Sequence, residues 1–281
     1  MELGYKKDIN NNDLENDDQG LELLPQDVIL PSCNESPELG ADKILLNISF
    51  FIDEMLQQFY KLGRFYSFES EKDIAGTLVA VIAPHTSAAV VGRIIGFSKT
   101  QGFFAHPLFH AATRRDCDGD EASIILLMDA LLNFSKQYLP NTRGSTQDAP
   151  LVLTSKLIPS EVDDMAFDLD IAKRYPLEFY EACMSFKKPW EVEVEQFSRK
   201  LDTEEQYYGL GFTHDVSNIN AGVRCSAYKI LPSMEEKRLG QMDLADKIRA
   251  VDAVDVARLV IEKHLIRDIR GNLRKFSMQQ F

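Results

Sequence analysis

Apolar and polar positions follow patterns along the chain that predict several regular elements. Apolar residues recur at helical spacing over 41–59, and Gly63 follows them, so we predict a helix there. Residues 77–83 form a short, largely β-branched run that Pro84 closes, which predicts a buried strand. The same criteria predict one more strand at 151–157 and helices at 177–184, 234–249 and 252–264.

The patterns between these elements are less regular. Residues 86–97 predict a short apolar helix with Thr86 or Ser87 as its cap. Residues 103–115 are aromatic and irregular, which favours a strand that enters a loop, and Pro107 argues against a helix there. Residues 122–138 have the pattern of a strong amphipathic helix.

This mixture of isolated strands and helices predicts an α+β fold, not a regular βαβ array. Residues 1–40 are rich in Asn, Asp, Glu and Pro, so we expect a disordered acidic leader. We expect a helical lead-in at 41–73, a mixed domain at 74–232, and a basic helical segment at 233–281.

Composition narrows the class of protein. The chain has 281 residues, 44% of them hydrophobic, which excludes collagen, a coiled coil and disorder throughout. The formal net charge is −13, but residues 1–40 hold ten acids and only two lysines. The remainder is close enough to neutral for a local basic surface to bind nucleic acid.

The sequence also indicates a compartment. No apolar run approaches the roughly 20 residues that a membrane span needs, and the start lacks the apolar core of a secretory signal, so we expect no membrane partner. The four cysteines are far apart and form no Cys-x-x-Cys pair, which argues against a zinc knuckle or a disulfide framework. We therefore expect a cytoplasmic, reducing environment.

The densest group of candidate chemical residues lies at 116–121. Asp116, Asp118, Asp120 and Glu121 fall within six positions, and such carboxylates repel one another unless a cation neutralises them. Gly119 would allow a loop to turn two carboxylates toward one point. Oxygen ligands suit Mg²⁺ or Mn²⁺, so a metal site is one interpretation.

Two simpler interpretations stay open. An Asp-Gly-Asp sequence is most often a turn. Acids are also favoured at helix N-termini, so capping of the helix predicted from 122 onward would explain the same residues. His106 and His110 lack the intervening Glu of a His-Glu-x-x-His zinc motif, and we expect a structural or phosphate-adjacent role for both.

Several long motifs resemble a known family. They are APHTSAAVVGRIIGF at 83–97, HPLFHAATRRDCDGDE at 106–121, YGLGFTHD at 208–215 and HLIRDIRGNLR at 264–274. In this order they resemble the large, catalytic subunit of the archaeal D-family DNA polymerases, over roughly residues 41–281. We find no such resemblance over residues 1–40.

The resemblance implies a fold and a site. The family has two double-psi β-barrels, akin to those of multisubunit RNA polymerases, and we expect the second barrel, with inserted helices, at 74–232. The matching positions make Asp118 and Asp120 the catalytic ligands of Mg²⁺ or Mn²⁺. Asp116 stands where the family usually has Asn, so its catalytic role is an open question. Arg114, Arg115 and His110 are hypothesised to bind substrate phosphates.

The resemblance also implies a reaction and partners. A primer 3′-hydroxyl would attack the α-phosphate of a deoxynucleoside triphosphate during DNA replication. Partners would be primer–template DNA, the small exonuclease subunit, the remaining part of the large subunit and, as a further candidate, a sliding clamp. We expect a carboxy-terminal-side fragment that lacks the first barrel with its lysines and a zinc module, from a split gene or a truncation. The alternative is a catalytically incomplete fragment that serves DNA binding or assembly.

Overall fold

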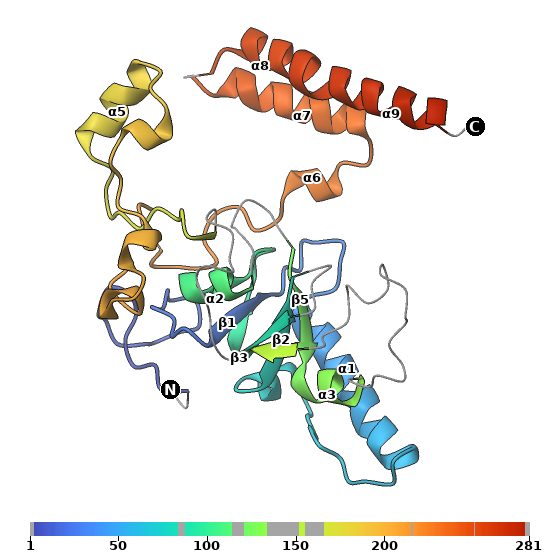
Figure 1. Ribbon diagram of the computed structural model, residues 1–281. Coiled ribbons are helices and arrows are strands. Elements are labelled where there is room, and N and C mark those ends of the chain that lie inside the picture. The colour runs from blue at the N-terminus through green and yellow to red at the C-terminus, as the bar shows by residue number, and fades with distance from the viewer. Residues whose placement is uncertain are drawn as a thin grey trace. The chain divides into compact units, whose positions relative to one another are not determined.

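The computed structural model describes residues 3–83, 88–113, 121–133, 152–154, 166–214, 216–249 and 251–278. The chain divides into two compact units, Met1–Cys225 and Ser226–Phe281. The first unit combines helices with all the described strands, and the second is helical (Figure 1). The predicted α+β class is therefore confirmed.

Among the described residues, the first unit contains six strands and several helices. Its strands are β1 (Asp27–Pro31), β2 (Leu78–Ile82), β3 (Ala88–Ser98), β4 (Phe104–Ala105), β5 (Ser123–Leu126) and β6 (Val152–Thr154). Its α-helices are α1 (Ala41–Gln58), α2 (Pro107–Ala112), α3 (Leu127–Asn133) and α5 (Leu177–Met184). Short 3₁₀ helices are η1 (Glu71–Ile74), η4 (Pro189–Glu191), η5 (Phe197–Lys200) and η6 (Glu204–Gln206).

The described strands form one mixed sheet. Five strands follow the order β4-β1-β3-β2-β5, and β6 pairs with the beginning of β3. β3 is the longest strand and lies parallel to β1 and β6 but antiparallel to β2. β5 is antiparallel to β2. Because β3 pairs with three other strands, it organises the whole sheet.

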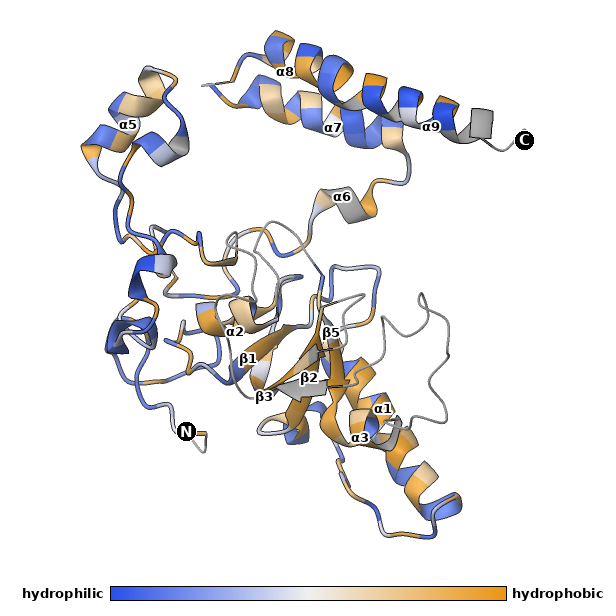
Figure 2. Cartoon of the chain, in the orientation of Figure 1, coloured by the Kyte–Doolittle hydropathy of each residue, from blue (hydrophilic) through white to orange (hydrophobic). Residues whose placement is uncertain are grey.

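Alternation along β2 sorts the core onto two faces. Val79 and Val81 pack in the main apolar cluster with Ile52 of α1, whereas Ala80 and Ile82 pack with Ala130 of α3. This two-residue period is the property of a strand buried on both faces. Figure 2 shows the apolar residues concentrated on these strands and on α1. The predictions of β2 and α1 are confirmed.

The expectation of a disordered leader at residues 1–40 is wrong for the segment that forms β1. Val28 and Leu30 are fully buried, and β1 lies between β3 and β4 in the sheet. The acidic composition of the surrounding residues concealed a short apolar run whose partners lie more than 60 residues later. Long-range pairing, which composition does not report, orders this segment.

The helix predicted at 86–97 is also wrong, because residues 88–98 form β3. Its apolar residues are largely β-branched, and Gly92 and Gly96 would weaken a helix. Gly92 has a packing role as well, since a Cβ there would lie 2.8 Å from Cζ of Phe109 in α2. The strand therefore admits the aromatic ring of α2 at this position.

Two further predictions need correction. Residues 123–126, expected at the start of a helix, form β5, and the helix begins only at Leu127. Residues 107–112, expected to be irregular, form α2 with Pro107 in its first turn. Proline is well tolerated there because the first N–H groups of a helix have no partner within the helix. The strand predicted at 151–157 is confirmed over 152–154.

The second unit consists of helices α6 (Ala227–Ile230), α7 (Met234–Lys247), α8 (Ala253–Leu259) and α9 (Ile266–Met278), with a π-helical segment at Val260–Leu265. The helices predicted at 234–249 and, in the first unit, at 177–184 are confirmed. The predicted helix at 252–264 corresponds to α8 and the π-helical segment. The boundaries of the four expected segments stay predictions.

Candidate functional site

One edge of the sheet collects the ends of four strands. Ile82, the last residue of β2, pairs with Ala89 of β3 and with Ser123 of β5. Ala88, the first residue of β3, pairs with Val152 of β6. The end of β2 and the beginnings of β3, β5 and β6 therefore lie at the same edge. Polar groups from segments distant in sequence can meet at such an edge.

The predicted catalytic segment leads into this edge. Asp116, Asp118, Asp120, Arg114 and Arg115 fall in 114–120, outside the described residues. The residues on either side are described. Buried Thr113 follows α2, and exposed Glu121 precedes β5. The predicted roles of the aspartates as metal ligands and of the two arginines as phosphate contacts stay predictions.

The observed β5 bears on one of the alternatives to a metal site. Capping required a helix that begins near 122, immediately after the acids. Residues 123–126 are instead a strand paired with β2, and α3 begins at Leu127. The helix expected from 122 onward, which the capping interpretation required, is therefore not present at 123–126. The interpretation of the acids themselves stays a prediction.

His106 has a structural role at the start of α2. Its Nδ1 accepts a hydrogen bond from the N–H of Leu108 at 3.1 Å, so the side chain caps the helix. Its Nε2 lies 3.1 Å from the carbonyl oxygen of Tyr207 and donates to it in the tautomer that this arrangement requires. Burial lowers the pKa of His106, although the bond to Tyr207 opposes the shift. The imidazole is thus a neutral link between α2 and residue 207.

His110 lies one turn further along α2. Burial lowers its pKa to about 4, with a smaller contribution from His106, so the ring is neutral near pH 7. The ring lies beside Phe103, with 5.1 Å between the two centroids. His110 therefore cannot supply a positive charge to a phosphate at that pH. If His110 binds substrate, it does so as a neutral hydrogen-bonding group.

A buried ion pair holds the N-terminal segment against β3. Fully buried Asp27 accepts from Nε and Nη2 of Arg93, each at 2.7 Å, and from the Tyr5 hydroxyl at 2.6 Å. Burial, reinforced by the hydrogen bond to Asp27, raises the pKa of Tyr5. The hydrogen bond from the guanidinium of Arg93 to Asp27 raises the pKa of Arg93 in the same way. Sequence reasoning missed this group because nothing local relates its members.

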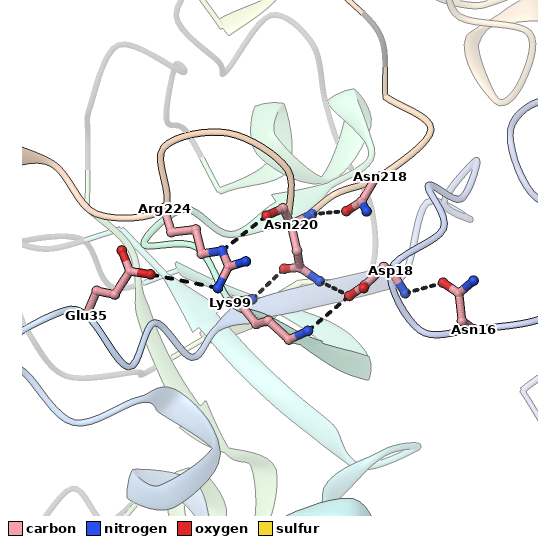
Figure 3. Close-up of polar contacts among 7 residues, drawn as sticks. All are labelled: Asn16, Asp18, Glu35, Lys99, Asn218, Asn220 and Arg224. Atoms are coloured by element: carbon pink, nitrogen blue, oxygen red, sulfur yellow. Dashed lines mark hydrogen bonds and ion pairs between the residues drawn. The ribbon is translucent and has the colours of Figure 1, made fainter.

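A second polar network joins three distant segments, as Figure 3 shows. Nδ2 of Asn220 donates to Asp18 at 2.6 Å, and the backbone N–H of Lys99 donates to Oδ1 of Asn220 at 2.6 Å. Arg224 donates to the carbonyl oxygen of Asn220 and pairs with Glu35. The hydrogen bond from Asn220, followed by that from Lys99, lowers the pKa of Asp18. The network fastens the N-terminal 40 residues, through Asp18 and Glu35, to the rest of the first unit.

The described residues offer no alternative metal centre. No group of three or more His, Cys, Asp or Glu side chains in that part of the chain is placed to hold an ion. The carboxylates at 116, 118 and 120 therefore stay the candidate ligands. Within the same described ranges, no helix combines the length and the apolar character that crossing a lipid bilayer requires.

Comparison with known proteins gives one consistent result. The family model for the catalytic domain of the DNA polymerase II large subunit DP2 matches residues 1–237. The DNA polymerase II large subunit of Archaeoglobus fulgidus is 52% identical over 282 residues, an alignment that covers 100% of this chain and 24% of that protein. The corresponding protein of Pyrococcus furiosus is 51% identical over 282 residues and is covered to 22%. That of Thermoplasma acidophilum is 48% identical over 283 residues and is covered to 24%.

These matches correct one expectation and show how much of each relative this chain represents. The family match begins at residue 1, so the expectation that residues 1–40 lack this resemblance is wrong. The reason is visible in the fold, because this segment contributes β1 and both polar networks to the first unit. The chain spans about a quarter of the length of the curated relatives that it matches.

Proposed function

The chain belongs to the family of the DNA polymerase II large subunit DP2 catalytic domain, and we propose that its segment 114–120 supplies the metal-binding carboxylates of a DNA-directed DNA polymerase. The family match over 237 of the 281 residues carries this proposal. The structure lends support in one respect. The acidic segment 114–120 precedes β5, which begins at the edge where four strand ends meet, and among the described residues that follow it the first helix begins only at Leu127.

The donor set fits Mg²⁺ or Mn²⁺. Asp118 and Asp120 flank Gly119, and both ions prefer carboxylate oxygens, so these two side chains would hold the metal, with Asp116 as a third candidate. When bound, divalent metal ions lower the pKa of the attacking primer hydroxyl and offset the charge of the leaving pyrophosphate. The aspartates would remain ionised, because neighbouring positive charge favours the charged form of a carboxyl group.

The neighbouring residues would act on the substrate phosphates. Arg114 and Arg115 present planar, permanently charged groups, which suit a nucleoside triphosphate or a DNA backbone. Neutral His110 would contribute at most a hydrogen bond. His106 would act indirectly, since it caps the helix that leads into this segment. The substrates would be deoxynucleoside triphosphates and primer–template DNA.

We further propose that the sheet of the first unit belongs to the second double-psi β-barrel of the family. The first barrel would come from the remaining part of the large subunit, and the 3′–5′ exonuclease from the small subunit. A sliding clamp is a further candidate partner. Activity would then require these parts in addition to this chain, as its coverage of about a quarter of each relative suggests.

An exposed aromatic group supports this need for further polypeptide. It extends from the middle of α1 to the residues that follow the helix, and we call it the aromatic end. Its members are Phe50, Phe51, Phe59, Tyr60, Leu62 and Phe65, which are 45–75% exposed. Folded proteins that expose clustered large apolar side chains usually bury them against a partner. We assign this surface to the remaining part of the large subunit, which the relatives carry in the same polypeptide.

The aromatic end is held in place. Asp53, which is buried on α1, accepts hydrogen bonds from the backbone N–H groups of Phe65, Tyr66 and Ser67 at 2.7–2.9 Å. The segment after α1 is therefore fixed, and its exposed rings form a defined surface. This arrangement also favours the alternative, in which the chain serves only assembly or DNA binding.

Metal binding separates the two functions. The complex would contain this chain, the remaining large subunit and the small subunit, and bound Mn²⁺ would be measured by electron paramagnetic resonance. We expect D118N/D120N to abolish the tightest Mn²⁺ sites, whereas E178Q/E181Q, which removes the same charge from exposed positions on α5, should retain them. Unchanged Mn²⁺ binding by D118N/D120N would favour the assembly function.

A further inference from the structure

A cavity in the first unit lies apart in sequence from the acidic segment. It has a volume of about 410 Å³, and its lining includes Lys173, Arg174, Glu193, Glu195, Gly209 and Gly211. This is large enough to admit a phosphate group together with part of the molecule that carries it. Its walls come from three stretches of chain, near 171–176, 193–195 and 209–211.

Backbone contacts fix the walls. The N–H of Ile171 donates to the carbonyl oxygen of Glu195 at 2.9 Å, which joins the first two stretches. A Cβ at Gly211 would lie 2.2 Å from the carbonyl oxygen of Ile171 and 2.7 Å from the backbone N of Lys173. Only glycine permits this approach, so the third stretch packs directly against the residues that carry the cations. The hydrogen bond between His106 and Tyr207 connects that stretch to α2.

The charges of the lining are unequally balanced. Oε1 of Glu193 pairs with Nη1 of Arg199 at 2.6 Å, and Oε1 of Glu195 pairs with Nζ of Lys200 at 3.0 Å. Both partners lie outside the lining. Lys200 also pairs with Glu205, and the N–H of Gly209 donates to Glu22. Lys173 and Arg174, by contrast, form no ion pair with any residue that the structure describes. Both acids of the lining therefore already contact cations outside it, and Lys173 and Arg174 are the lining cations left available to a ligand.

We propose that this cavity is a phosphate-binding site, with Lys173 and Arg174 as its anion-binding residues. Arginine and lysine together provide a planar fork and a compact charge, both of which bind phosphate oxygens well. The phosphate would belong either to a DNA strand or to a free nucleotide, since both present the same oxygens. The site is independent of the role proposed for Asp118 and Asp120, and no metal ion is needed for it.

Binding in the absence of divalent cations tests the site. The full chain, in EDTA, would be titrated with a fluorescently labelled single-stranded oligonucleotide and, separately, with dATP and inorganic pyrophosphate. We expect K173A/R174A to weaken binding about tenfold or more. K187A/K188A removes the same charge from an exposed pair outside the lining and should leave affinity within about twofold.

The three probes identify the source of the phosphate. Loss of affinity for the oligonucleotide alone indicates a DNA strand, loss for dATP and pyrophosphate alone indicates a free nucleotide, and loss for all three indicates a general phosphate site. No loss for any probe, or an equal loss in K187A/K188A, would overturn the proposal. G211A, which changes the wall of the cavity but no charge, should also weaken binding. Thermal melting of each variant would verify that it is folded.

Discussion

The two units of this chain are stabilised in different ways. In the first, strands that are distant in sequence bury most of the apolar core, and buried Asp27 is paired with Arg93. In the second, Ala245 is the one buried residue among those whose side chains the structure describes. Its helices are supported by local caps and by ion pairs three or four residues apart. Long-range packing therefore organises one unit, and local interactions organise the other.

The largest effect should follow from breaking the buried pair of the first unit. Arg93→Met leaves the fully buried carboxyl group of Asp27 without its bidentate partner, so we expect the unfolding free energy to fall by about 3–5 kcal/mol. Urea denaturation followed by circular dichroism would measure it. The double variant D27N/R93M should recover part of the loss, because no buried charge remains. A loss of less than about 1 kcal/mol in R93M would contradict the role assigned to this pair.

A smaller, pH-dependent effect should come from His110. Its pKa is lowered from 6.5 to about 4, so the unfolded chain binds the proton more readily than the folded one. Stability should therefore be complete above pH 6.5 and fall as the pH drops toward 4, by up to about 3 kcal/mol from this group.

Comparison with variants isolates that contribution. H110Q should lose stability less steeply than the unmodified chain over this pH range, whereas H214Q, which alters an exposed histidine, should follow the unmodified chain. Urea midpoints at several pH values would show the difference. Parallel curves for H110Q and the unmodified chain would count against a partly buried, neutral imidazole.

In the second unit, the cap of α7 should matter locally. Ser233 accepts from the N–H of Glu236 at 3.2 Å, and Oε2 of Glu236 accepts from the N–H of Ser233 at 3.1 Å. Ser233→Ala should cost about 1 kcal/mol of helix stability. Hydrogen exchange should become faster in the first turns of α7 and remain unchanged in β2 and β3. Faster exchange throughout the sheet would mean that the units are not separately organised.

The smallest effect is expected at Arg258. It pairs with Asp255 at 2.6 Å and with Glu262 at 3.0 Å, but all three side chains are about half exposed. Surface ion pairs contribute little because water screens the charges. Arg258→Met should leave the melting temperature of the full chain almost unchanged, in sharp contrast to Arg93→Met. Comparable losses in the two variants would remove the distinction between the units.

The same contrast explains which elements the sequence predicts. The helices at 41–58 and 177–184 carry apolar residues at helical spacing, the helix at 234–247 begins at the capping box of Ser233 and Glu236, and all three are confirmed. β1, β3 and β5 were missed because their conformation depends on strands elsewhere in the chain. Residues 123–126 illustrate this, since the helical pattern around them yields to pairing with β2.

For the candidate site, local sequence was informative only in part. The Asp-Gly-Asp motif and its arginines could be chosen from residue type and spacing, although their placement lies outside the described residues. The cap formed by His106 was missed because Pro107 argued against a helix, whereas its place in the first turn favours one. The cavity beside Lys173 and Arg174 has no sequence signal, because its walls are far apart in the chain.

The most direct test of the proposed function is single-turnover incorporation of one deoxynucleotide into a primer. It would use the complex of this chain with the remaining large subunit and the small subunit, in the presence of Mg²⁺. We predict that D118N/D120N lowers the rate at least a hundredfold, roughly the loss that follows removal of one preorganised charge-stabilising group, while E178Q/E181Q retains it. An unchanged rate in D118N/D120N would contradict the assignment of these aspartates.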